Sequence, residues 1–234
     1  FQSAARQAIH KLVNVLPAGM VDRLGESAQS VHIHLDPRNS LDGMQGVYDQ
    51  FVDCIRCGHP ARVSYQSLSP PDAVETKISP YHLLFSRRSW YVIGRSSVHR
   101  GIRTFNLSRI REVETLAAES FTRPERFSLD QYLGNAWHLI REKPYNQEVV
   151  IRFQPLVADN VAEVRWHKTQ RSEKQPDGSL DFRVTVDGLR EISWWVLGYG
   201  DQAEVLAPRP LREMLADRAN ALAAVYSRSD ISPS

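Results

Sequence analysis

The fold is decided by three neighbouring segments: Pro80-Tyr-His-Leu-Leu-Phe85, Trp90-Tyr-Val-Ile-Gly94 and Arg103-Thr-Phe-Asn-Leu-Ser-Arg109. Each is short, apolar and aromatic, and turn-forming residues separate it from the next. We expect strands at 61–66, 74–79, 81–85, 90–95, 102–108 and 110–116, after a helix over 41–57 that ends before Gly58. Short strands at this spacing, led by a helix, predict a small β-barrel.

Alternation along the third segment predicts which side chains share a face. In a strand, Arg103, Phe105, Leu107 and Arg109 point to one side, so an arginine would lie at each end of an apolar pair. Arginines at the rim of a small barrel could clamp an anion. The same alternation places neighbouring Trp90 and Tyr91 on opposite sides of their strand, so we expect at most one of them to face a ligand.

The charge is concentrated around these strands. Seven arginines and no lysine, Asp or Glu lie between Tyr81 and Arg111, namely Arg87, Arg88, Arg95, Arg100, Arg103, Arg109 and Arg111. Arginine without lysine favours bidentate or stacked recognition of phosphate, carboxylate or bases. The alternative is a solvated basic face whose acidic partners come from elsewhere in the fold.

The last third has a different pattern. We expect strand 148–153, helix 156–164, a hairpin of 168–173 and 180–187, helix 190–197, strand 203–207 and helix 210–226. The order βαββαβ is the ferredoxin-like arrangement. The fold class is therefore α+β, with domains at 1–40 (helices and a short strand), 41–120 (barrel) and 147–228 (ferredoxin-like), and with a linker over 121–146 that contains a helix at 129–141.

Composition limits the classes of protein that remain. Of 234 residues 42% are hydrophobic and 24% charged, the net charge is +2, and the longest apolar runs are too short for a membrane span. Two cysteines form no disulfide framework, so we expect a cytoplasmic protein without a membrane partner. The chain begins with Phe1 and shows no signal peptide, so we expect it to be part of a longer one.

No motif makes a positive case for catalysis, a metal or a cofactor. Cys54 and Cys57 lack the further ligands of a zinc site, and small core residues are the better interpretation. His32 and His34 share a predicted strand face without a carboxylate nearby. The string from Gly198 to Ala203 matches G-x-G-x-x-A, but a helix precedes it and a strand follows, the reverse of a dinucleotide site. We expect a protein that is not an enzyme.

The three opening segments resemble the WYL domain of bacterial transcriptional regulators, over about 41–116. The region of about 147–226 resembles the WCX extension that follows WYL in these proteins, and the leading helices resemble the connector to a winged helix-turn-helix. Two departures from the family pattern are Val92 in place of leucine and Ser108 in place of an acidic residue.

The resemblance implies an SH3/Sm-like barrel that senses an effector and passes the signal to the helix-turn-helix. In some relatives the effector is single-stranded nucleic acid. The residues carried over by the motif are Tyr91, Arg103 and Arg109. Local reasoning adds His82, Arg95 and Arg87 as ligand contacts, and Trp90 and Phe105 as stacking or core aromatics.

The expected partners follow from this resemblance. They are single-stranded nucleic acid or a nucleotide-like anion, a second copy of the chain, and promoter DNA through a helix-turn-helix that is not among these residues. The alternative is a module that senses nothing and serves dimerisation or protein interaction in a transcription factor. The paired Trp194-Trp195 and the closing helix could supply that surface or belong to the core.

Overall fold

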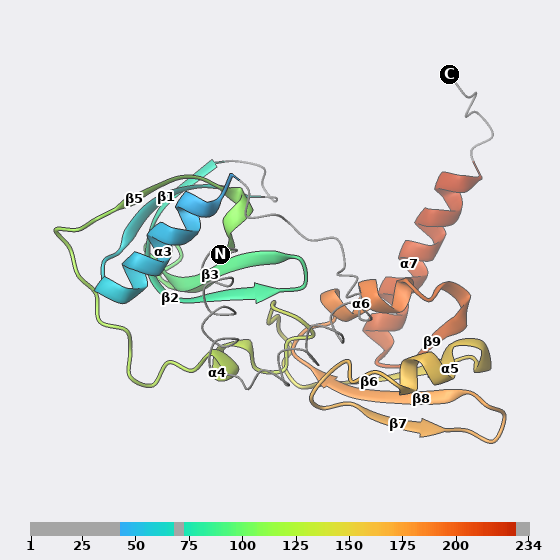
Figure 1. The fold of residues 1–234 in the computed structure, drawn as a ribbon. Coiled ribbons are helices and arrows are strands. Elements are labelled where there is room, and N and C mark those ends of the chain that lie inside the picture. Colours follow the sequence, from blue (N-terminus) through green and yellow to red (C-terminus); the bar gives the residue numbers. More distant parts are fainter. Residues whose placement is uncertain (1–42, 68–72, 228–234) are drawn as a thin grey trace, which may run out of the picture. The chain divides into compact units, whose positions relative to one another are not determined.

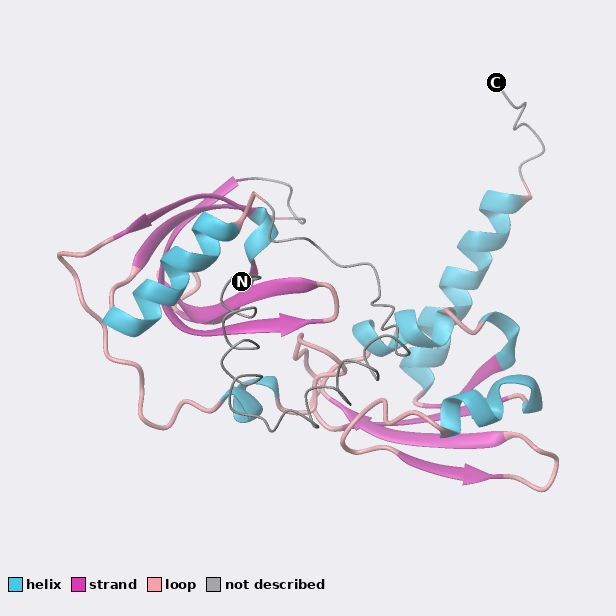
Figure 2. Cartoon of the chain, in the orientation of Figure 1, coloured by secondary structure: helices cyan, strands magenta, loops and turns pink. Residues whose placement is uncertain are grey.

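The computed structural model describes residues 43–67 and 73–227, all of which belong to the unit Leu41–Ser234. The helices expected at 3–16 and 19–24, the strand at 31–35 with its two histidines, and the whole 1–40 domain lie outside the described residues. Figure 1 traces the chain, and Figure 2 colours the same view by secondary structure.

The first part is a five-stranded antiparallel sheet led by one helix. Its elements are α3 (Gln45–Cys57), β1 (Ala61–Gln66), β2 (Ala73–Ser86), β3 (Ser89–Ser96), β4 (Gly101–Asn106), the 3₁₀ turn η1 (Leu107–Arg109) and β5 (Ile110–Thr115). The strand order is β4-β3-β2-β1-β5, the bent-sheet order of the expected SH3/Sm-like barrel. Helix α3 ends because Gly58 adopts a left-handed φ of 71°, which a residue without Cβ adopts at little cost.

Two details of this sheet differ from the expectation. The strands predicted at 74–79 and 81–85 are one strand, β2, whose register with β3 shifts between Pro80 and His82. The strand predicted over 102–108 ends at Asn106, because the Asn106 carboxamide oxygen accepts hydrogen bonds from both the backbone N–H and the hydroxyl of Ser108. Such an Asx turn bends the chain into η1, so alternation does not continue to Leu107 and Arg109.

The core of this part lies between α3 and the sheet. Its buried side chains are Phe51, Cys54, Ala61, Val63, Ile78, Val92, Phe105, Leu107 and Ile110. Cys54 is fully buried and lies 3.5 Å from the Thr115 hydroxyl, whereas Cys57 is exposed. The interpretation of the two cysteines as core residues is therefore confirmed for Cys54 and wrong for Cys57. Within the described ranges no cluster of His, Cys, Asp or Glu could hold a metal ion.

The segment expected as a linker holds only one short helix, α4 (Leu129–Leu133). The helix predicted over 129–141 stops there because Gly134 has a φ of 53°, outside the helical region. Beyond α4 the segment 135–146 forms no regular element, and side chains from the last third hold its backbone.

The last third forms a four-stranded antiparallel sheet with helices on one side of it. The elements are β6 (Gln147–Phe153), α5 (Pro155–Ala162), β7 (Arg171–Lys174), β8 (Leu180–Val186), α6 (Arg190–Leu197), the 3₁₀ turn η2 (Gly200–Gln202), β9 (Ala203–Ala207) and α7 (Arg209–Tyr226). The strand order β7-β8-β6-β9 is the ferredoxin-like order, so that prediction is confirmed. Figure 2 shows α5 and α6 over the same face.

The core of this part uses one side of every strand. On β8, Phe182 and Val184 are buried beneath the helices, while Asp181, Arg183 and Thr185 point to the opposite face. The two tryptophans of α6 separate: Trp195 packs into an aromatic cluster with Trp137 and Phe153, and Trp194 is 64% exposed with Arg218 over its ring. None of the helices in the described ranges is long and apolar enough to cross a membrane.

Candidate ligand-binding site

The predicted site residues divide between two faces of the β2–β3–β4 ladder. Tyr91 pairs with Asn106, and His82 pairs with Ile93, which is two residues from both Tyr91 and Arg95. His82, Tyr91 and Arg95 therefore share one face. On the other face Phe105 is buried in the core and Trp90 packs against it. Their rings contact Tyr65 and Tyr48 at 5.1 Å and 4.9 Å between centroids, so both are core aromatics.

Arg103 shares the face of Phe105 and Trp90 but lies outside their core cluster. It pairs with Gly94, three residues beyond Tyr91, and therefore lies on the face opposite Tyr91. Among the described residues its guanidinium has one acceptor, the Ile102 carbonyl at 2.8 Å, and the residue is exposed. Arg103 lines a cavity of about 520 Å³, here called the β4 pocket, whose walls are Ile102, Arg103, Thr104, Tyr132, Leu139, Ile140, Arg141 and Tyr145.

The tyrosines and the second arginine of the β4 pocket come from the segment expected as a linker. The Tyr132 hydroxyl lies 3.0 Å from the Thr104 hydroxyl and so joins α4 to β4. The Arg141 guanidinium stacks over the Tyr145 ring, 4.6 Å from its centroid. Two tyrosine rings and the Arg103 guanidinium, which has no ion pair within the described ranges, suit a ligand that carries both a flat ring and negative charge, while Arg141 is already paired with Asp187.

Two carboxylates of the last third fix the backbone that lines this pocket. Asp187, 2% exposed at its side chain, accepts from the backbone N–H of Asn135 and Asn146 and from Arg141 at 2.7 Å. Burial raises the pKa of the Asp187 carboxyl, but these three hydrogen bonds outweigh burial and lower it. Glu191 accepts from the consecutive backbone N–H groups of 138, 139 and 140 at 2.8–3.2 Å.

His138 belongs to the backbone segment that Asp187 and Glu191 hold, and its own N–H donates to Glu191. Its Nε2 is buried and has no hydrogen-bond partner within the described ranges. Burial, together with the neighbouring Arg87 and His167, lowers the pKa of His138 from 6.5 to about 4. The imidazole is therefore neutral at physiological pH, and the positive charge in this region comes from arginine.

The hairpin turns place two further arginines in an unusual backbone conformation. Arg87, between β2 and β3, has a φ of 55°, and Arg100, between β3 and β4, has a φ of 50°. L-residues rarely adopt this left-handed region, and glycine or asparagine would fill it at lower cost. The sequence nevertheless has an arginine at both positions, and both side chains are exposed.

The arginines between 81 and 111 lack acidic partners. None of the seven forms an ion pair within 4.0 Å of an acidic residue in 43–67 or 73–227. Arg109, in η1, is half-buried even so. Burial of an arginine side chain without a counter-ion is unfavourable where it removes hydration from the guanidinium group. The interpretation of these arginines as paired with acids elsewhere gains no support from the described part of the chain.

The structure thus does not bring the predicted site residues together in one place. His82, Tyr91 and Arg95 share a face, Arg103 lines the β4 pocket, Arg109 lies in η1 and Arg87 at a turn. Tyr132, Arg141 and Tyr145, which also line the β4 pocket, were not predicted from the sequence. The available signal was the pairing of arginine and tyrosine within 132–145, a composition unusual for a spacer.

Comparison with known families agrees with this architecture. The WYL domain matches residues 46–115, which span α3 to β5, and the WCX domain matches residues 145–223, which span β6 to most of α7. The chain therefore contains a WYL domain followed by a WCX domain, as the sequence resemblance predicted.

Two solved structures are similar to the chain. Proteasome accessory factor B/C (PafBC) of Arthrobacter aurescens is 19% identical, and the match covers 82% of this chain and 29% of that protein, with a TM-score of 0.36. A CRISPR Cas-related protein is 13% identical over 80% of this chain and 52% of that protein, with a TM-score of 0.49. The chain therefore spans about a third and about half of their lengths. No curated protein matches its sequence.

Proposed function

We propose that this chain is the effector-sensing part of a DNA-binding transcriptional regulator, and that it binds an anionic ligand through the arginines and aromatic residues of its WYL domain. Single-stranded nucleic acid, or a nucleotide-like anion, is the ligand class that this chemistry fits. The role is one of binding rather than catalysis. Promoter DNA would be read by a helix-turn-helix in another part of the regulator.

The observation that carries this proposal is the absence of counter-ions. Seven arginines lie in an acid-free segment and none is ion-paired within the described ranges, although ten ion pairs form elsewhere in those ranges. Unpaired guanidinium groups next to tyrosines are the groups that bind single strands without reading their sequence, by phosphate contacts and by stacking. The β4 pocket offers both kinds of group in one cavity.

Fluorescence anisotropy of a labelled oligothymidylate of about ten nucleotides tests the proposal. We expect binding that weakens steeply between about 50 and 200 mM salt, because phosphate contacts release counter-ions. Arg103→Ala and Arg109→Ala should each weaken binding. Arg62→Ala is the matched control, since Arg62 is an exposed arginine of the same sheet that pairs with Glu114. Absence of binding to oligonucleotides and to nucleotides at low salt would refute the proposal.

A second candidate function is dimerisation, and helix α7 favours it. From residue 219 to 226 the helix carries no charge, and Leu222, Val225 and Tyr226 are 56%, 55% and 82% exposed. An apolar helix face of this kind fits the same face of a second copy. Light-scattering mass measurements distinguish the two functions. Leu222→Asp should yield monomers and leave oligonucleotide binding intact. Arg103→Ala should leave the dimer intact and weaken oligonucleotide binding.

A further inference from the structure

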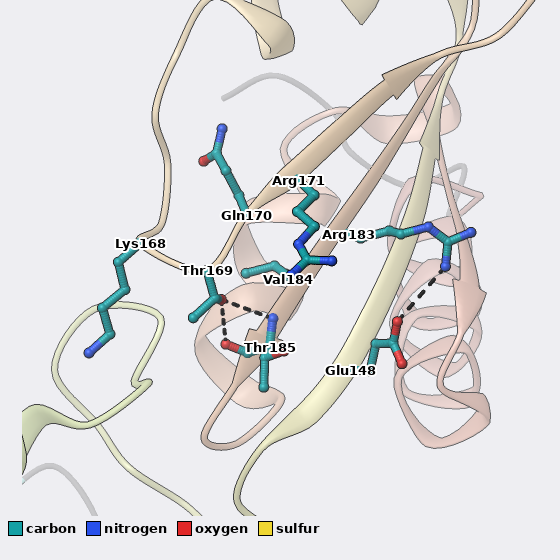
Figure 3. Close-up of a pocket in the computed structure, with 8 residues that line it drawn as sticks. All are labelled: Glu148, Lys168, Thr169, Gln170, Arg171, Arg183, Val184 and Thr185. Carbon is teal, nitrogen blue, oxygen red and sulfur yellow. Dashed lines mark hydrogen bonds and ion pairs between the residues drawn. The ribbon is translucent and has the colours of Figure 1, made fainter.

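The open face of the WCX sheet carries two arginines directly opposite each other. Arg171 of β7 pairs with Arg183 of β8 in the antiparallel register, and both are exposed. Directly paired residues on one sheet face have Cβ atoms about 5 Å apart, and like charges at that distance destabilise the sheet. Figure 3 shows the two side chains on adjacent strands beside a cavity of about 580 Å³.

Acidic residues near this pair compensate its charge only in part, and Glu173, which shares the face two residues along β7 from Arg171, forms no ion pair with either arginine. Glu148 is the only acidic residue that lines the cavity, and its carboxylate is 3.9 Å from Arg183 with both side chains exposed, a weak pair. Asp181 lies on the same face of β8, two residues from Arg183, and accepts two hydrogen bonds from Arg152, at 2.8 Å and 2.9 Å. Arg171 forms no ion pair within the described ranges. With Lys168 at the rim, the lining carries three cations and one anion.

The wall beside the two arginines is fixed by hydrogen bonds. The Thr169 hydroxyl donates to the Thr185 carbonyl at 2.9 Å and accepts from the Thr185 N–H at 3.0 Å, which continues the β7–β8 ladder beyond the end of β7. The Gln170 carboxamide accepts from the His167 N–H and donates to the Val164 carbonyl. The Lys168 ammonium donates to the Gly134 carbonyl. Arg171 thus extends from an ordered segment, and little backbone freedom is lost when it binds.

We propose that this surface, defined by Arg171 and Arg183 with Lys168 at its rim, binds the phosphate groups of a nucleotide or of a nucleic-acid strand. Paired guanidinium groups chelate tetrahedral oxyanions through several N–H donors, and an anion between them removes the repulsion across the strand pair. The open face lacks the aromatic side chains with which other sheet surfaces stack bases, since its central positions are Val150, Arg183 and Thr185. The site therefore recognises phosphate and not a base. It is separate from the β4 pocket and does not depend on the function proposed above.

Isothermal titration of the full chain with inorganic pyrophosphate tests this site. The double variant Arg171→Gln/Arg183→Gln should bind pyrophosphate at least about tenfold more weakly. The control Arg165→Gln removes an exposed arginine of the same domain that does not line the cavity, and its affinity should equal that of the native chain. Glu148→Gln should bind more tightly, and Glu163→Gln, which removes an exposed acid outside the cavity, should not. The double variant should unfold at the native temperature or higher, because it removes a repulsive pair.

The source of the phosphate is decided by a second titration, with oligothymidylate. If the double variant also weakens oligonucleotide binding, a strand occupies the site; if only pyrophosphate binding weakens, the ligand is a free nucleotide. Equal pyrophosphate affinities of the native chain and the double variant, or no binding to either, would overturn the proposal. Since Arg103→Ala leaves this site intact, failure here and failure of the WYL-domain proposal are measured separately.

Discussion

Tyr91 and Arg103 lie on opposite faces of the β3–β4 ladder, because Tyr91 pairs with Asn106 and Arg103 pairs with Gly94. One compact ligand group cannot contact both side chains through the sheet. A single-stranded nucleic acid that passes around the sheet edge at β4 could contact both side chains. Each contact would then contribute independently to the binding free energy.

Additivity is the first prediction. Tyr91→Phe and Arg103→Ala should each weaken oligothymidylate binding, and the double variant should show the sum of the two free-energy changes within about 0.5 kcal/mol. Anisotropy titrations of the four proteins at one salt concentration measure this. A coupling well beyond that range would mean that both side chains contact the same group of the ligand.

The left-handed turn at Arg87 gives the second prediction. Arg87→Gly should leave the free energy of unfolding within about 0.5 kcal/mol of the native value, because relief of the positive φ offsets the added freedom of glycine in the unfolded chain. If Arg87 contacts a phosphate, the slope of the logarithm of the oligonucleotide binding constant against the logarithm of salt concentration should decrease in magnitude by about one. Arg88→Gly, in the same turn but without a positive φ, should be the less stable variant. Denaturant titration compares them, and the reverse order would contradict the strain argument.

Stability should decrease as the pH falls below 6.5. The pKa of His138 is about 4 in the folded chain and near 6.5 when unfolded, so between these values the unfolded chain takes up a proton that the folded chain does not. The full shift corresponds to about 3 kcal/mol, which partial exposure of the ring reduces to about 1–2 kcal/mol. His138→Gln should flatten this part of the thermal-unfolding profile, while His167, whose pKa burial also lowers, keeps a smaller slope.

Asp187 acts in a lower pH range and supports a separate prediction. Its pKa is lowered in the folded chain, so its stabilisation is present above its ordinary pKa near 3.8 and is lost as the pH falls through the lower, folded value. At neutral pH, Asp187→Asn should lower the free energy of unfolding by about 2–3 kcal/mol. The reason is that a neutral carboxamide replaces the buried carboxylate that accepts hydrogen bonds from Arg141 and two backbone amides. Asp159→Asn, at an exposed ion pair, should change stability by less than about 0.5 kcal/mol. Equal effects of the two would refute the assigned role.

Helix α7 has a buried and an exposed half. Leu211→Ala should destabilise the chain by about 2–5 kcal/mol, since Leu211 is fully buried, whereas Leu222→Ala should change the stability of the monomer by less than about 0.5 kcal/mol. Chemical denaturation at two protein concentrations measures both variants. A concentration-dependent loss for Leu222→Ala would instead support the dimer.

Apolar spacing and turn residues predicted most of the helices and strands. Strand β1 and helix α6 have the predicted bounds, and the βαββαβ order was legible because each element of the last third is bounded by turn residues. The site was predicted less well. Residues were assigned to faces by assuming an unbroken strand to Ser108, and the Asn106–Ser108 Asx turn ends it earlier. That signal is present in the sequence as Asn106-Leu107-Ser108 directly after Phe105.

Other features depend on contacts that sequence does not reveal. The segment 135–146 lines the β4 pocket only because Asp187 and Glu191, about fifty residues away, bind its backbone amides. The adjacent Trp194 and Trp195 have identical side chains, and only packing decides which one is buried. The repulsive pairing of Arg171 with Arg183 follows from the strand register, which was not part of the prediction.

The clasp that Glu191 forms on the three consecutive amides at 138–140 has a thermodynamic consequence. Two of these residues, Leu139 and Ile140, belong to the wall of the β4 pocket, and Glu191 belongs to the first turn of α6. A ligand that prefers another backbone conformation there must release charge-assisted hydrogen bonds to α6. By linkage, a variant that weakens these hydrogen bonds, such as Glu191→Gln, should raise the affinity for a ligand of that kind.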